Sequence, residues 1–204
     1  MSSSKLPNPI LYNPDKHVHL IPQLARIHGD CITTDGTLAT FLPPLSTSKI
    51  IDFWTSYAAS CSSSTDTTTG RLIVLQLSSS STPSGTDQND EVLGYVSLSM
   101  PETETGPFRS EVLKLLVSPT ARKMGVARRV MGALESDARN RGRELLMLDT
   151  TIGSPAEHVY PKLGYTQVGV IPKYGIHPLT GELVDEVFFY KDLRETEVCW
   201  RPEI

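Results

Sequence analysis

One segment near the middle of the chain, residues 115–131 (LLVSPTARKMGVARRVM), limits the fold more than any other. An apolar run typical of a buried strand passes through a turn straight into an amphipathic helix. The apolar residues of that helix recur at helical spacing: Ala127, Val130, Met131, Leu134 and Ala138. A helix start has about four backbone N–H groups without partners and carries partial positive charge. Because Gly125 allows close approach to the backbone, this turn is suited to binding a pyrophosphate.

The turn alone does not identify the ligand, since a solvated basic turn would contain the same residues. Two known phosphate-binding patterns are excluded. A Walker motif requires Gly-Lys-Ser/Thr, whereas Val126 follows Gly125 here. The dinucleotide fingerprint requires three glycines, and the turn has a single one.

Strand and helix patterns alternate along the rest of the chain. Strands are expected at residues 71–77, 91–100, 109–119, 145–151, 166–172 and 184–193, with a short one near 17–20. Helices are expected within residues 21–45 and at 46–61, 127–142 and 154–164. This order predicts a mixed α/β fold with a central mixed sheet of about six to seven strands and helices on both faces.

The composition fits one soluble domain. The chain has 204 residues, 39 % of them hydrophobic, and a formal net charge of −4, which argues against a dedicated nucleic-acid binder. No run approaches the roughly 20 apolar residues that cross a bilayer. Cys31, Cys61 and Cys199 form no CxxC pair, so neither a disulfide framework nor a metal site is expected. We therefore expect a cytoplasmic protein that uses no metal, membrane or nucleic acid.

Two Ser/Thr-rich segments, residues 60–70 and 78–90, flank the strand at 71–77. Their composition favours exposed loops at either end of one strand over linkers between domains. We expect an N-terminal extension at residues 1–14, one domain at 15–194 that includes both loops, and a C-terminal tail at 195–204.

Two linked motifs carry a family resemblance. The sequence RKMGVA, with Arg122, Gly125 and Ala127, resembles the Arg/Gln-x-x-Gly-x-Gly/Ala signature of the GNAT N-acetyltransferases. About 30 residues on, SPAEHVYPKLGY (154–165) is similar to the family's second block, which ends in Tyr-x-x-Leu-Gly-Tyr/Phe. Within the family, residues 109–193 are most similar in pattern to acetyltransferases of the tabtoxin-resistance type. The resemblance implies the GNAT acyl-CoA N-acyltransferase fold.

The resemblance also implies acetyl-CoA as the acetyl donor and a set of residues that hold it. The pantetheine arm would pair with the backbone of Leu115, Leu116 and Val117. The pyrophosphate would rest on the turn and the first helical residues: Arg122, Lys123, Met124, Gly125, Val126, Ala127 and Arg128.

Three residues are catalytic candidates. Glu111 lies at the start of the strand, by alternation on the face of Leu113, Leu115 and Val117, and matches the catalytic glutamate of family members that acetylate histones. Asp149 lies at the end of the next strand, where the resemblance places the cofactor. Glu111 is the first candidate for the general base and Asp149 the second, and either could instead be a structural carboxylate at a strand end. Tyr160 matches the family tyrosine that protonates the departing thiolate.

Acceptor contacts are expected from the segment at residues 171–183, through Tyr174 and His177, although His177 also fits an ordinary surface loop. A strand N–H of Leu116 or Val117 would stabilise the oxyanion. The expected reaction is direct transfer of acetyl to the primary amine of a small molecule, such as an amino acid or a peptide-like toxin or antibiotic. Two alternatives remain: the acceptor is a protein lysine or N-terminus, or the chain is a non-catalytic acyl-CoA-binding module. The resemblance leaves a homodimer open.

Overall fold

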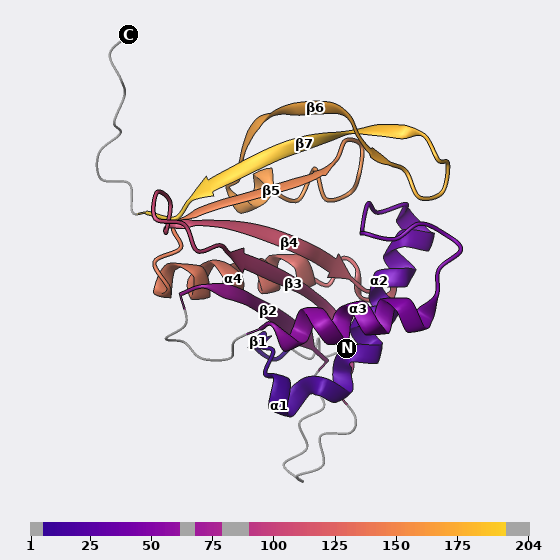
Figure 1. Ribbon diagram of the computed structural model, residues 1–204, viewed down its shortest axis with the longest axis horizontal. Helices are drawn as coiled ribbons and strands as arrows, with labels where there is room; N and C mark the ends of the chain where they lie inside the picture. Colours follow the sequence, from indigo (N-terminus) through magenta and orange to yellow (C-terminus); the bar gives the residue numbers. More distant parts are fainter. Residues whose placement is uncertain (1–5, 62–67, 79–89, 195–204) are drawn as a thin grey trace, which may run out of the picture.

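The computed structural model describes residues 6–61, 68–78 and 90–194. The helices are α1 (Pro14–His17), α2 (Ile21–Asp35), α3 (Thr47–Ala59) and α4 (Val126–Asn140), with 3₁₀ helices η1 (Val18–Leu20), η2 (Pro119–Ala121) and η3 (Pro161–Leu163). The strands are β1 (Ile10–Leu11), β2 (Gly70–Leu77), β3 (Val92–Met100), β4 (Arg109–Val117), β5 (Leu145–Thr151), β6 (Thr166–Ile176) and β7 (Leu183–Asp192). They form one sheet in the order β1-β2-β3-β4-β5-β7-β6 (Figure 1). The mixed α/β fold expected from the sequence is confirmed.

Each face of the sheet has its own apolar core. The face covered by α4 buries Val130, Met131 and Leu134 of that helix against strand residues such as Leu98 and Leu146. The opposite face packs α2 and α3, with Leu24, Ile27 and Trp54, against Ile73 and Tyr95. The helices form because their apolar residues recur at helical spacing, and Ser46 caps α3 by accepting a hydrogen bond from the N–H of Lys49 at 3.3 Å.

The sheet is interrupted between β4 and β5. These two strands run parallel and pair over three positions, from Arg109 with Leu145 to Glu111 with Met147. Beyond Glu111 they diverge, and Figure 1 shows β4 continuing beside β3 while β5 stays with β7. The β4 edge from residue 112 to 117 is therefore without a β5 partner on its way to the turn before α4.

A bulge in β4 changes which side chains share a face. Leu116 pairs with Tyr95 but Leu113 pairs with Ser97, so two β4 residues, Lys114 and Leu115, stand opposite Val96. Lys114 has a φ of 56°. The expectation that Glu111, Leu113, Leu115 and Val117 share one face is wrong, because the extra residue reverses the alternation. Leu115 and Val117 pack with the α4-side core, whereas Glu111 faces the side of α3.

Other local expectations also need correction. The helix expected at residues 154–164 is a series of turns followed by η3, because Pro161 has no N–H to donate within a helix. The strand expected near residues 17–20 is the end of α1 followed by η1, and a strand occurs earlier, at β1. That strand and the start of α1 lie inside the segment expected to be an N-terminal extension. The turn expected at 171–183 is shorter, because β6 continues to Ile176.

Parts of the expected loops and tail lie outside the described residues, namely 62–67, 79–89 and 195–204, and Cys199 is among them. In the described part of the chain, no helix is long and apolar enough to span a bilayer.

Candidate active site

The turn before α4 has the properties expected of an anion site. Gly125 is the N-cap of α4 with a φ of 79°, and a side chain built on it would meet no protein atom within 4 Å. The first recorded backbone bond of the helix runs from the N–H of Arg129 to the carbonyl of Gly125. Among the described residues, no acceptor is recorded for the N–H groups of Val126, Ala127 and Arg128. These groups remain available to a ligand at the positive end of the helix dipole.

The guanidinium of Arg122 is already engaged. Its Nη1 donates to Oδ1 of Asp35 at 2.8 Å, and its Nη2 donates to the other oxygen of the same carboxylate. This pair ties the C-terminal turn of α2 to the turn before α4. The contribution of Arg122 to an anion site is therefore through its backbone.

Asp149 lies at the centre of a group of polar side chains where β4 and β5 diverge. Its charge acts on Glu111, Lys114, Tyr160, Tyr174 and Glu186. Although the residue is exposed, partial desolvation of its carboxyl raises the pKa of Glu111, the charge of Asp149 raises it further, and Lys114 opposes both effects. The structure thus places Glu111 and Asp149 on one face of the sheet, whereas Tyr160 packs in the core on the α4 side and feels the charge of Asp149.

Lys114 reaches this group from the β4 bulge. Its Nζ donates to Oγ1 of Thr40 at 2.7 Å, in the connection between α2 and α3, and lies over the ring of Phe53. That connection is itself anchored, because Trp54 Nε1 donates to His28 Nδ1 and the other ring nitrogen of His28 donates to the carbonyl of Ala39. Burial lowers the pKa of His28 to about 4, so the ring is neutral at physiological pH.

Tyr160 is buried among aromatic rings, next to Tyr165 and Phe189. Burial raises the pKa of Tyr160, and the charge of Asp149 raises it further. The phenol is therefore protonated at neutral pH, which is the form needed to donate a proton.

Tyr174 and His177 occupy the hairpin between β6 and β7. Tyr174 is 53 % exposed, and the charge of Asp149 is the main cause that raises its pKa. His177 Nδ1 accepts from the N–H groups of Leu179 and Thr180 at 3.3 and 3.2 Å, so it shapes the hairpin turn. Of the two expected acceptor contacts, Tyr174 is the one near the acidic side chains of Glu111, Asp149 and Glu186, whose charges all act on it.

The same hairpin contacts the connection between α2 and α3. A Cβ on Gly36 would lie 2.3 Å from the ring of His177, and a Cβ on Gly175 would lie 2.3 Å from the side chain of Leu38. These two glycines allow the β6–β7 hairpin and the α2–α3 connection to meet beside these acidic side chains. Tyr174 lies on the hairpin and Thr40 on the connection.

Two residues near Asp149 were missed at the level of sequence. Lys114 is brought in by the bulge, which depends on cross-strand pairing and has no local signature. Glu186 lies on β7 between hydrophobic residues, and alternation with Val187 and Phe189 assigns it only to the face opposite α4. It lies on the same face as Asp149 in the neighbouring strand, since it pairs with Thr151 of β5, and the charge of Asp149 acts on its carboxyl. Within the described residues, no cluster of three or more potential metal ligands is found.

Comparison with known families agrees with the geometry. The model of the acetyltransferase (GNAT) family matches residues 51–165, more than half of the chain. The chain belongs to the GNAT family. It is therefore an acetyl-CoA-dependent N-acetyltransferase. The match covers the diverging strands, the turn before α4 and the segment that ends at Tyr165.

Solved structures share the GNAT fold at low identity. yncA from Salmonella typhimurium, solved with its cofactor acetyl-CoA, has a TM-score of 0.66 at 15 % identity, with 94 % of this chain and 98 % of that chain covered. A proposed phosphinothricin N-acetyltransferase has a TM-score of 0.66 at 15 % identity, covering 92 % and 100 %. Ribosomal-protein-alanine N-acetyltransferase from Brucella melitensis has a TM-score of 0.64 at 19 % identity, covering 90 % and 99 %. These likenesses establish the fold.

The residues of this chain fit the acetyl donor that the GNAT family uses. The unpaired edge of β4 can hydrogen-bond an extended chain, as another strand would. The N–H groups at the start of α4 and the open space at Gly125 suit a pyrophosphate.

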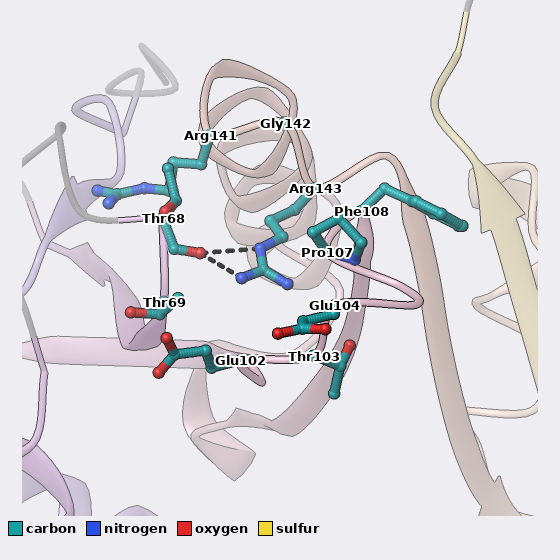
Figure 2. Close-up of a pocket in the computed structure, with 10 residues that line it drawn as sticks. All are labelled: Thr68, Thr69, Glu102, Thr103, Glu104, Pro107, Phe108, Arg141, Gly142 and Arg143. Carbon is teal, nitrogen blue, oxygen red and sulfur yellow. Dashed lines mark hydrogen bonds between the residues drawn. The ribbon is translucent and has the colours of Figure 1, made fainter.

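A pocket of about 390 Å³ lies away from this site, at the C-terminal end of α4 (Figure 2). Arg143 forms part of its wall and is 2 % exposed. Its guanidinium donates to the backbone carbonyls of Thr68, Pro101 and Arg109, which joins the ends of β2, β3 and β4. These hydrogen bonds explain why an arginine is buried here: its guanidinium links the ends of three strands.

We expect Arg143→Ala to destabilise the fold by about 3 kcal/mol, because three backbone carbonyls lose a charged donor. The midpoint of thermal unfolding should fall by roughly 6–12 °C, measured by circular dichroism. The turnover of the remaining folded enzyme should not change. Arg26→Ala is the control, since Arg26 is exposed and its 3.6 Å ion pair with Asp30 should contribute less than about 1 kcal/mol. Equal losses in the two variants would contradict the structural role of Arg143.

Proposed function

We propose that this GNAT enzyme acetylates the primary amine of a small molecule by direct attack, with Asp149 as the general base. The observation that carries the proposal is the central position of Asp149. Its charge acts on five neighbouring polar side chains, and it lies where β4 and β5 separate. The similarity in pattern to tabtoxin-resistance acetyltransferases supports a peptide-like toxin, an antibiotic or an amino acid as the acceptor.

The proposed roles follow from the protonation of each group. An ammonium group must lose a proton before its nitrogen can attack, and the carboxylate of Asp149 takes that proton directly or through water. Glu111, exposed at the start of β4, helps to attract the cationic acceptor. Tyr160 holds a proton at its hydroxyl that the departing thiolate can take. Bound acetyl-CoA supplies the acetyl thioester.

Direct attack is supported by the state of the two cysteines in the described residues, Cys31 and Cys61. Burial raises the pKa of Cys31 to about 11 and that of Cys61 to about 12. Both are therefore thiols at neutral pH, whereas a nucleophile must be a thiolate. Neither is suited to carry an acetyl group between donor and acceptor.

A small acceptor is supported by the contact between the β6–β7 hairpin and the α2–α3 connection. The close approaches at Gly36 and Gly175 bring these segments together beside the acidic group. A protein acceptor needs an open groove in which an extended segment of its chain can lie. The contact between the hairpin and the α2–α3 connection narrows the access to Asp149 on the side where these two segments meet.

A panel of acceptors tests the proposal. Release of free coenzyme A from acetyl-CoA would be followed with a thiol reagent, for amino acids, dipeptides, amine-bearing antibiotics and lysine-containing peptides of about ten residues. We expect turnover with a member of the small-molecule groups and at least about tenfold lower kcat/KM for the long peptides. Preference for a long peptide would favour the protein-acceptor alternative. No turnover with any amine, despite acetyl-CoA binding, would favour the non-catalytic alternative.

A further inference from the structure

Glu186 is a buried acid in the candidate site that the reaction outlined above does not use. It is 4 % exposed, on the β7 face that also bears Phe188, and pairs across the sheet with Thr151. In the part of the chain that the structure describes, no ion pair includes Glu186. A buried carboxylate without a cation is costly, so this side chain needs a specific explanation.

The surroundings of the Glu186 carboxyl offer it one strong partner. Oε1 accepts a weak 3.5 Å hydrogen bond from Oγ1 of Thr151, and Oε2 is buried with no donor recorded among the described residues. The carboxyl group of Asp149 lies next to it on the same face of the sheet, because Glu186 pairs with Thr151 and Asp149 is two residues before Thr151 on β5. On the other side of β7, Ile171 of β6 pairs with Glu186. Tyr174, also on β6, is a titratable group whose pKa is raised in part by the charge of Glu186.

A hydrogen bond between two carboxyl groups requires a proton on one of them. Glu186 is the more buried of the two, and burial disfavours its charged form. Burial, with the hydrogen bond to Asp149 and the charge of that residue, raises the pKa of Glu186 to about 8. The ammonium group of Lys114 donates to Thr40 and acts on Asp149 and Glu111.

We propose that Glu186 is a positioning residue for acetyl transfer, whose carboxylic acid donates a hydrogen bond to Asp149 and holds that carboxylate ready to accept the proton of the amine. This inference rests on the proposed role of Asp149. In the proton transfer, an N–H bond of the ammonium breaks and an O–H bond forms on Asp149. The proton of Glu186 stays in place throughout.

Two substitutions separate positioning from a purely structural role. Glu186→Ala removes the donor, and kcat should fall by about 10- to 100-fold, the factor that corresponds to a hydrogen bond to a charged group. Glu186→Gln keeps a neutral N–H donor at the same place and should restore kcat to within about threefold of the wild type at pH 7. Glu182→Gln, an exposed acid next to β7, is the matched control and should leave the pH profile unchanged.

The pH profile gives the specific signature. Above pH 8 the wild type loses its carboxylic acid donor, whereas the glutamine variant keeps a donor at every pH. The ratio of kcat/KM for Glu186→Gln to that of the wild type should therefore be constant below about pH 7 and rise above pH 8. A ratio that does not change with pH, or a glutamine variant as inactive as the alanine variant, would overturn the proposal. The second result would make Glu186 itself the proton acceptor.

A titration that needs no turnover completes the test. The carboxyl carbon of Glu186 would be followed by NMR in protein labelled with ¹³C-glutamate and assigned by its loss in Glu186→Gln. We expect a midpoint near pH 8 that falls in Asp149→Asn, where the neighbouring charge is removed. A midpoint in the acid range would overturn this inference alone. A midpoint near pH 8 together with full activity of Asp149→Asn would overturn the proposed base and the positioning role with it.

Discussion

Asp149→Asn is expected to lower kcat for acetyl transfer by about 10²- to 10⁴-fold, the usual loss when a general base is removed. The amide has nearly the same size as the carboxylate but cannot accept a proton at neutral pH. Because Asp149 lies on β5 and is not part of the turn before α4, the affinity for acetyl-CoA should be retained. The measurement is steady-state kinetics with the best acceptor amine, together with thermal unfolding in the presence of acetyl-CoA.

Glu111→Gln is the comparison that decides between the two acids. Glu111 is exposed, while Asp149 is half-buried and acts on more of the surrounding groups. We expect the glutamine variant to raise KM for a cationic amine and to change kcat by less than about tenfold. The reverse order, with the larger loss of kcat in Glu111→Gln, would assign the base to Glu111. Loss of acetyl-CoA binding in either variant would indicate a change of structure and not of proton transfer.

The elements that could be predicted from the sequence are those defined by local periodicity. The strand expected at residues 145–151 coincides with β5, and the helix expected at residues 46–61 is α3 (Thr47–Ala59). The helix after Gly125 is predicted because its apolar residues recur at helical spacing. Alternation and capping act within a few residues, so a single sequence contains the information needed.

Features that depend on pairing between distant segments were not accessible in this way. The bulge at Lys114 arises because β4 has one residue more than β3 between two pairs, and it reverses the faces of Leu115 and Val117. The burial of Glu186 depends on its position opposite Thr151 in β5. In the segment at 154–164, the helical pattern was outweighed by Pro161, which removes a donor in the last turn.

The candidate site shows the same division. Glu111, Asp149 and Tyr160 could be selected from the family resemblance, because they belong to segments with recognisable motifs. Lys114 and Glu186 enter the site only through the bulge and the β5–β7 register. The motifs therefore predict the groups that act on the substrates, whereas the groups that adjust the charge and orientation of those residues required the folded chain.

Gly125→Glu is expected to abolish the stabilisation of the protein by acetyl-CoA. A ligand present at 100 times its dissociation constant stabilises the folded state by about 2.7 kcal/mol, which should raise the wild-type unfolding midpoint by roughly 5–10 °C. In the variant, a carboxylate occupies the open space beside the first N–H groups of α4, where the pyrophosphate is expected to bind. Repulsion between the two negative groups should remove the shift.

Two control variants separate the loss of acetyl-CoA binding from the backbone strain and the added charge that Gly125→Glu also introduces. Gly142→Glu places the same charge at another glycine of positive φ with open space around it, at the far end of α4, and should suffer similar backbone strain. Gly132→Glu adds the charge on the exposed face of the same helix without that strain. Both should keep the full shift with acetyl-CoA, whatever their own midpoints. If Gly125→Glu also keeps it, the pyrophosphate binds elsewhere, because a carboxylate at this position cannot coexist with an anion on the same N–H groups.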